Sequence, residues 1–134
     1  MNGSMSRRDV STILIVDDDH AIRRLVKDCL ERAGYAVLAA ADGLEAVAVF
    51  KQHRLNIALV ITDVAMPNMN GLDLADSVFE MESRVPVLFM SGDAISTGRA
   101  RGCLAKPFTS ARLLDRVRHA LDSTDRGIVS PVSL

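Results

Sequence analysis

The stretch Ile13-Leu14-Ile15-Val16-Asp17-Asp18-Asp19 decides how the rest of this sequence is interpreted. Its four apolar residues are typical of a strand buried on both faces of a parallel sheet. Three carboxylates follow immediately, so negative charge gathers at the edge of the core. Two like charges ~4 Å apart repel by about 4 kcal/mol at an effective dielectric of ~20, so this cluster needs a cation nearby.

A second apolar run, Ile57-Ala58-Leu59-Val60-Ile61-Thr62, also ends in an acid, Asp63. When two such strands lie side by side in a parallel sheet, their terminal carboxylates meet at the same edge. Carboxylate oxygens are the ligands that Mg²⁺ prefers in proteins. The two junctions together therefore predict a magnesium site.

Size and composition limit what the chain can be. Its 134 residues suit one compact domain, and its 49% hydrophobic residues suffice for a core. The formal net charge of −1 gives no reason to expect nucleic acid or an acidic membrane as a partner. The apolar runs are far shorter than the ~20 residues that span a bilayer, and no signal peptide is visible, so we expect a cytoplasmic protein. Cys29 and Cys103 match no metal or redox spacing and are expected to be reduced core thiols.

Apolar runs alternate with segments of helical period. We expect residues 1–10 to be a tag or disordered N-terminus, 11–122 to be the folded domain and 123–134 to be a C-terminal tail. The runs typical of strands are 12–16, 35–39, 57–62, 86–90 and 103–105. Helices are expected over 22–33, from a cap at Asp42, after Gly71 and over 109–121.

The expected helices carry apolar stripes that should face the sheet. Besides the clearly central positions, these stripes include Leu25, Leu44, Ala48 and Phe79. The last helix also has a basic face, which we interpret as solvated, made of Arg112, Arg116, Arg118 and His119. Strands that alternate with helices over short connections predict a doubly wound parallel sheet covered on both faces, with right-handed crossovers.

Polar residues follow the expected strands at one edge of this sheet. Ligands of doubly wound folds bind beyond the carboxyl ends of the strands. Asp63 can act as a nucleophile toward phosphorus. Mg²⁺ held by Asp18 and Asp63, with Asp17 acting through water, would neutralise charge, and Lys106 would add a mobile cation. Ser91 can donate its hydroxyl hydrogen to a phosphoryl oxygen.

Four motifs resemble the receiver domain of two-component response regulators. They are Ile13–Asp19, Ile61-Thr62-Asp63-Val64-Ala65-Met66-Pro67-Asn68-Met69-Asn70-Gly71, Phe89-Met90-Ser91-Gly92 and Ala105-Lys106-Pro107-Phe108-Thr109. The resemblance covers about residues 11–122. It implies a flavodoxin-like sheet of five parallel strands in the order 2-1-3-4-5.

The same resemblance implies roles for individual residues. Asp63 would accept a phosphoryl group from the phosphohistidine of a histidine kinase or phosphotransfer protein. Asp17 and Asp18 would hold Mg²⁺, with the backbone carbonyl of Ala65 as a further ligand. Ser91 and Lys106 would contact the phosphoryl group, and the Lys106–Pro107 peptide would be cis. The domain would be no conventional enzyme, since it would catalyse only its own phosphorylation and dephosphorylation.

Two features depart from the family pattern. Only fifteen positions separate Ser91 from Lys106. If the fifth strand begins near Cys103, about ten residues make the crossover, which is close to the minimum of ~10–12 for a connection that includes a helix. We therefore predict a shortened or irregular fourth helix, and Gly98 further disfavours a long one. Cys103 stands where many receivers have an aromatic residue, so the usual aromatic coupling cannot operate unchanged.

Alternative functions remain open at this stage. The first is a receiver-like interaction module that works without phosphorylation. A phosphatase that turns over an external substrate is disfavoured because Ala65 stands where such enzymes usually place an acid/base Asp. A flavin binder is disfavoured because acids follow the first strand where a phosphate-binding loop would be needed. The expected output is binding to an unknown downstream protein, by a monomer or weak dimer that is a stand-alone regulator or a domain of a hybrid kinase.

Overall fold

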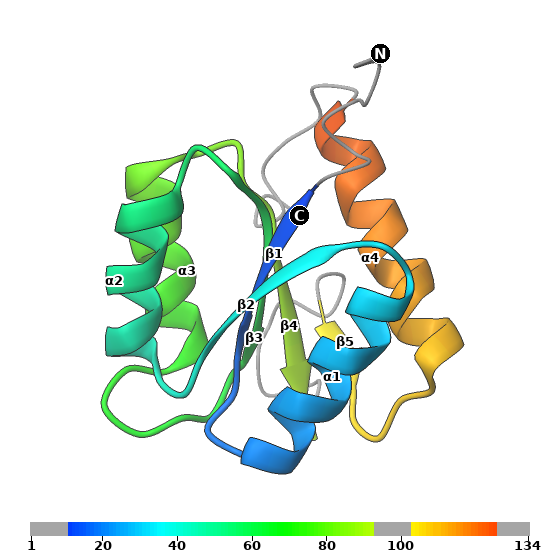
Figure 1. Cartoon of the computed structure of the whole chain (residues 1–134). Helices are drawn as coiled ribbons and strands as arrows, with labels where there is room; N and C mark the ends of the chain where they lie inside the picture. Colours follow the sequence, from blue (N-terminus) through cyan, green and yellow to red (C-terminus); the bar gives the residue numbers. More distant parts are fainter. Residues whose placement is uncertain (1–10, 93–102, 126–134) are drawn as a thin grey trace.

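The computed structural model describes residues 11–92 and 103–125 of the chain (Figure 1). Strands and helices alternate along most of this part, as the sequence predicts. The elements are β1 Thr12–Val16, α1 His20–Arg32, β2 Ala36–Ala40, α2 Gly43–His53, β3 Ile57–Asp63, α3 Gly71–Met81, β4 Val87–Ser91, β5 Cys103–Ala105 and α4 Ser110–Asp125.

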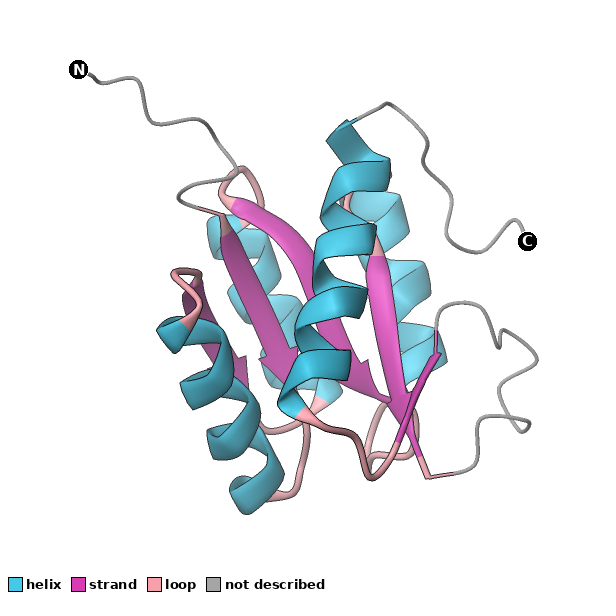
Figure 2. Cartoon of the chain, turned by 90° about the vertical axis from the view of Figure 1, so that its right-hand side faces the viewer, coloured by secondary structure: helices cyan, strands magenta, loops and turns pink. Residues whose placement is uncertain are grey.

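The five strands form one parallel sheet in the order β2-β1-β3-β4-β5, which confirms the predicted fold class. Figure 2 shows the strands side by side with their arrowheads toward the same end. The register pairs Val16 with Thr62, Asp63 with Met90, and Ser91 with Ala105. Residues far apart in sequence therefore meet at one edge of the sheet.

Helices cover both faces of the sheet, with α1 and α4 on one face and α2 and α3 on the other (Figure 1). Because side chains alternate along a strand, β1 contributes to both core layers. Ile13 and Ile15 pack with residues of α1 and α4, and Leu14 and Val16 pack with residues of α2 and α3. All four are fully buried, as the continuous apolar run predicts.

Element boundaries differ slightly from the predicted ones. β2 lies one residue later than predicted, and β3 and β4 each extend through the polar residue expected to follow them, Asp63 and Ser91. The parallel pairing continues to these positions, so the site residues are part of the sheet rather than of the loops. α4 continues to Asp125, three residues beyond the predicted domain boundary.

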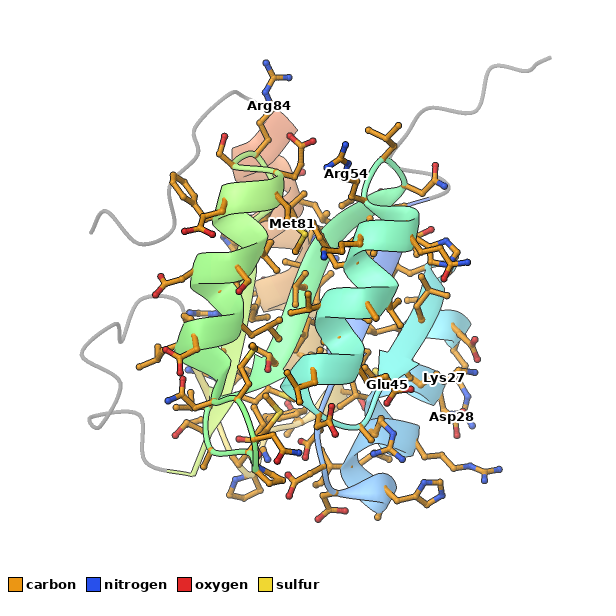
Figure 3. All side chains as sticks on the ribbon, turned by 90° about the vertical axis from the view of Figure 1, so that its left-hand side faces the viewer. Lys27, Asp28, Glu45, Arg54, Met81 and Arg84 are labelled. Atoms are coloured by element: carbon orange, nitrogen blue, oxygen red, sulfur yellow. The ribbon has the colours of Figure 1, made fainter. Side chains whose placement is uncertain are left out.

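The prediction that the apolar stripes face inward is wrong at several positions, including Ala33 at the end of the first stripe. Leu25, Leu44 and Phe79 are 64%, 57% and 50% exposed, and Ala48 is exposed as well. A helix touches a sheet along a narrow line, so the flanks of a wide apolar stripe remain in solvent. α2 and α3 also pack side by side on their face of the sheet (Figure 3), which buries their shared side and leaves the far side open.

Several predictions lie outside the described residues. They are the N-terminal segment 1–10, the fourth helix expected within 93–102, and the tail from residue 126 onward. The side chain of Cys103 also lies outside what the structure describes, although its backbone belongs to β5. Among the described residues, no helix combines the length and the apolar character needed to cross a membrane.

Two leucines in α1 provide a matched test of the core. Leu30 is fully buried and Leu25 is 64% exposed, while both changes to Ala carry the same small difference in helix propensity. We expect Leu30→Ala to lower the free energy of unfolding by about 2–5 kcal/mol and Leu25→Ala by less than about 1 kcal/mol. Urea titration followed by circular dichroism measures both. Equal losses in the two variants would contradict the packing described for α1.

Candidate functional site

The three neighbouring acids between β1 and α1 have two different roles, since one caps a helix and two belong to the acidic cluster. Asp19 is the N-cap of α1, and its Oδ1 accepts hydrogen bonds from the backbone N–H groups of Ala21 at 2.9 Å and Ile22 at 3.2 Å. Asp19 therefore stabilises the start of α1. Asp17 is fully buried, and its Oδ1 accepts a hydrogen bond from the backbone N–H of Asp19 at 2.8 Å. Asp18 is exposed beside it.

Lys106 lies between two carboxylates at the carboxyl edge of the sheet. Its Nζ is 3.2 Å from Oδ2 of Asp17 and 3.5 Å from Oδ2 of Asp63. The backbone N–H of Lys106 donates to the carbonyl of Ser91 at 2.8 Å, which extends the pairing of β4 with β5 by one residue. The cation needed by the acidic cluster is thus supplied by the segment that follows the last strand. The peptide between Lys106 and Pro107 is cis, as predicted.

Burial and charge act in opposite directions on this pair. Burial raises the pKa of Asp63, and the negative charge of Asp17 adds to this effect, while Lys106 and the backbone N–H of Ala65 oppose it. Burial disfavours the charged form of Lys106, but the carboxylates of Asp17 and Asp63 outweigh it and raise the pKa of Lys106. The ammonium group is therefore firmly charged, whereas the ionised form of Asp63 carries an electrostatic cost.

Three carboxylates converge closely enough to share one cation. One oxygen atom from each of Asp17, Asp18 and Asp63 lies within 4.8 Å of the others. Opposite oxygens around an octahedral Mg²⁺ are ~4.2 Å apart, because each Mg–O distance is ~2.1 Å. All three donors are hard carboxylate oxygens, which suit Mg²⁺ better than a thiophilic metal. The donor set therefore fits the magnesium predicted from the sequence.

The remaining predicted residues occupy the same edge. Ser91 is buried at the end of β4, next to the position where Met90 pairs with Asp63. Ala65 lies in the loop between β3 and α3, with its backbone N–H directed at the carboxylate of Asp63. The described structure places none of the predicted site residues elsewhere.

One contributor to the site was missed from the sequence. Arg23 donates from Nη1 to the carbonyl of Asp17 at 2.7 Å, and its Nη2 is 3.1 Å from Nδ1 of His20. The guanidinium thus fixes the backbone carbonyl of Asp17, a residue of the acidic cluster. A basic residue one turn into a helix that starts at a carboxylate cluster was only a weak signal, because the sequence does not show in which direction its side chain turns.

A five-stranded doubly wound sheet with acids and a lysine at its carboxyl edge defines a class of signalling domain. The sequence matches the response regulator receiver domain family over residues 13–118, and the chain belongs to this family. The family resemblance proposed from the four motifs is confirmed. A receiver domain is a signalling module and not a conventional enzyme.

Known relatives carry the domain in different settings. The transcriptional regulatory protein CseB of Streptomyces coelicolor is 38% identical over 120 residues, which cover 84% of this chain and 50% of CseB. The sensor histidine kinase RcsC of Escherichia coli is 33% identical over 125 residues, which cover 88% of this chain and 12% of RcsC. The chain spans about half or less of the length of such curated relatives.

A solved structure shares the fold over most of both chains. It is a chain of the CheX-CheY-BeF3-Mg+2 complex from Borrelia burgdorferi, which is 25% identical with a TM-score of 0.78. The match covers 86% of this chain and 97% of that chain.

The raised pKa of Asp63 predicts that removing its charge stabilises the protein. A group whose pKa is raised by folding stabilises the fold fully below its unfolded pKa, and this contribution is lost as pH rises through the folded pKa. We therefore expect Asp63→Asn to raise the urea midpoint at pH 7 in metal-free buffer, with the advantage shrinking as the pH falls through the raised pKa of Asp63 toward the ordinary range of an aspartate. Urea titrations between pH 4 and pH 8, with an accompanying far-ultraviolet signal, measure the difference.

Asp76→Asn is the control for this effect. Asp76 is an exposed acid in the middle of α3, away from the site. Its replacement is expected to leave the pH dependence of stability unchanged. A variant at Asp63 that is less stable than the wild type at pH 7 would contradict the electrostatic cost assigned to that residue.

Proposed function

We propose that Asp63 is the phosphoacceptor of this receiver domain and receives a phosphoryl group from a phosphohistidine. The observation that carries the proposal is the position of Lys106, 3.5 Å from Asp63 and 3.2 Å from Asp17. An aspartate can attack phosphorus only if the repulsion between the two anionic groups is neutralised, and Lys106 places a positive charge where the new bond forms.

In the proposed reaction, an Oδ atom of Asp63 forms a bond to phosphorus while the phosphorus–nitrogen bond of the donor breaks. The imidazole leaves with the electron pair of that bond and takes up a proton. Lys106 stabilises the charge on the phosphoryl oxygens, and the Ser91 hydroxyl donates a hydrogen bond to one of them. The Ala65 N–H, directed at the Asp63 carboxylate, orients the nucleophile.

Asp17, Asp18 and Asp63 are proposed to hold Mg²⁺ together with the backbone carbonyl of Ala65, Asp17 acting through water. When bound, the ion supplies charge neutralisation at the phosphoryl oxygens. The convergence of the three carboxylates supports this assignment. The presence of Mg+2 in the Borrelia burgdorferi complex supports it further.

The donor is proposed to be a histidine kinase or a phosphotransfer protein in the cytoplasm, and the output is proposed to be binding to a downstream protein. CseB and RcsC illustrate two settings for such a domain, a transcriptional regulator and a sensor kinase. A receiver-like module that works without phosphorylation is the competing function. The two differ in whether Asp63 becomes modified.

Acetyl phosphate tests the proposal directly. With Mg²⁺ present, we expect the wild type to gain about 80 Da, the mass of one phosphoryl group, in intact-mass spectra. Asp63→Asn should gain nothing, and Asp76→Asn should behave as the wild type. If wild type and Asp63→Asn show the same spectrum, the protein functions without phosphorylation of this residue.

Magnesium should stabilise the fold through the same carboxylates. At a free Mg²⁺ concentration tenfold above its dissociation constant, we expect the free energy of unfolding to rise by about 1.4 kcal/mol. Asp18→Asn should lose most of this gain because the ion loses a charged ligand, whereas Asp28→Asn, which changes an exposed acid of α1, should keep it. Thermal unfolding across a Mg²⁺ titration measures the effect. An equal gain in both variants would remove Asp18 from the metal site.

A further inference from the structure

The first residue of α2 packs tightly against the loop that joins β3 to α3. A Cβ added to Gly43 would lie 2.7 Å from Cβ of Met69 and 2.9 Å from both its Cγ and its carbonyl oxygen. Real Cβ atoms essentially never show contacts under 3.0 Å. Two of the three atoms belong to or adjoin the backbone, so relief requires the loop itself to move.

The start of α2 has little freedom to move away from the loop. Oδ1 of Asp42 accepts a hydrogen bond from the backbone N–H of Glu45 at 2.8 Å, and Oε1 of Glu45 accepts one from the backbone N–H of Ala41 at 2.7 Å. These bonds close the turn on both sides of Gly43, which is buried. Figure 1 shows the start of α2 and the β3–α3 loop at the same end of the molecule, and Glu45 lies near that end of α2 in Figure 3.

Two backbone hydrogen bonds hold the loop that runs between Asp63 and Met69. The backbone N–H of Met69 donates to the carbonyl of Pro67 at 2.8 Å, and Asn68 between them has a φ of 72°. At the other end, the backbone N–H of Gly71 donates to the carbonyl of Val64 at 2.8 Å.

Gly71 fixes the loop a second time. A Cβ added there would overlap the carbonyl oxygen of Asp63, so the start of α3 sits directly on the end of β3. The loop is therefore held between two helix starts, α2 at Gly43 and α3 at Gly71. Ala65, whose N–H is directed at the Asp63 carboxylate, lies inside this clamped segment.

We propose that Gly43 is a positioning residue for phosphorylation, acting through Met69 on the loop that orients Asp63. The proposal rests on the phosphoacceptor function proposed above. Gly43 touches no reacting group. Because it has no side chain, the loop can lie closer to the start of α2 than any other residue would allow. The start of α2 thereby becomes part of the machinery that sets the geometry of the nucleophile.

Gly43→Ala tests the proposal against the ordinary effect of a helical glycine. Where space is available, Ala favours a helix over Gly, so a purely local role predicts an unchanged or more stable protein with a normal reaction. We expect instead that Gly43→Ala slows phosphorylation by acetyl phosphate at saturating Mg²⁺ by about 10- to 100-fold, because small misplacements of a nucleophile cost that much. Leu44→Ala, in the same turn and at an exposed position, should stay within about twofold of the wild type.

A second measurement reports the loop without any phosphorylation. In ¹H–¹⁵N spectra, Gly43→Ala should shift the amide resonance of Ala65, while Leu44→Ala should leave it in place. This measurement also separates the two proposals. If the wild type is never phosphorylated, the phosphoacceptor function fails, while the Ala65 resonance still decides whether Gly43 positions the loop.

Met69 supplies the rescue. Met69→Gly removes two of the three atoms that would meet the new Cβ, so Gly43→Ala combined with Met69→Gly should react faster than Gly43→Ala alone. If Gly43→Ala does not fold, the phosphorylation rate of Met69→Gly tests the proposal by itself. We expect this variant to react more slowly, because it lacks the side chain that packs the loop against the start of α2. A folded Gly43→Ala variant with the wild-type rate and an unmoved Ala65 resonance, or a double variant no faster than the single one, would overturn the proposal.

Discussion

The structure depends on the placement of one ammonium group among buried carboxylates. Asp17 is fully buried and Asp63 is nearly so, and a buried carboxylate in its charged form is costly unless a cation lies nearby. Lys106 reaches both of them. Three carboxylates and one ammonium still leave an excess of negative charge at the edge of the core. Burial, with a further contribution from the charge of Asp17, raises the pKa of Asp63 in spite of Lys106. A divalent cation bound by these carboxylates would offset the excess of negative charge.

Sheet register is what turns distant residues into one site. Val16 pairs with Thr62 and Ser91 with Ala105, so the residues that follow or end these strands meet without any long loop having to reach across the molecule. Strands are rigid platforms, and groups fixed at their ends are placed more precisely than groups on loops. Arg23 and Asp19 add bracing from the first turn of α1, one holding the Asp17 carbonyl and the other capping the helix.

The sequence was most informative where the hydrophobicity or charge of a residue alone determines its place in the fold. Continuous apolar runs predicted the buried strands, and acids at their ends predicted the converging carboxylates, because charge at a core edge has few explanations. It was less informative about helix faces. Leu25 and Leu44 belong to apolar stripes, yet they lie in solvent, since the width of the contact between a helix and a sheet is a tertiary property. Arg23 was missed for a related reason: its role depends on where a flexible side chain turns back, which periodicity does not encode.

The charge balance of the site also limits which groups can move when Asp63 is phosphorylated. In the proposed function, phosphorylation replaces the single charge of the Asp63 carboxylate by the charge of about −1.5 to −2 that a phosphoryl group carries. Mg²⁺ would have neutralised the unmodified site, so the modified site again carries excess negative charge, and the nearest adjustable donors must move toward it. Lys106, already paired with Asp17 and 22% exposed, and Ser91 at the end of β4 are the groups placed to respond. Both lie on the β4–β5 side of the sheet.

The loop on the other side of Asp63 is held between the starts of α2 and α3. Because the loop is held in place while Lys106 and Ser91 can move, we expect structural change on phosphorylation to begin at the β4–β5 edge of the sheet.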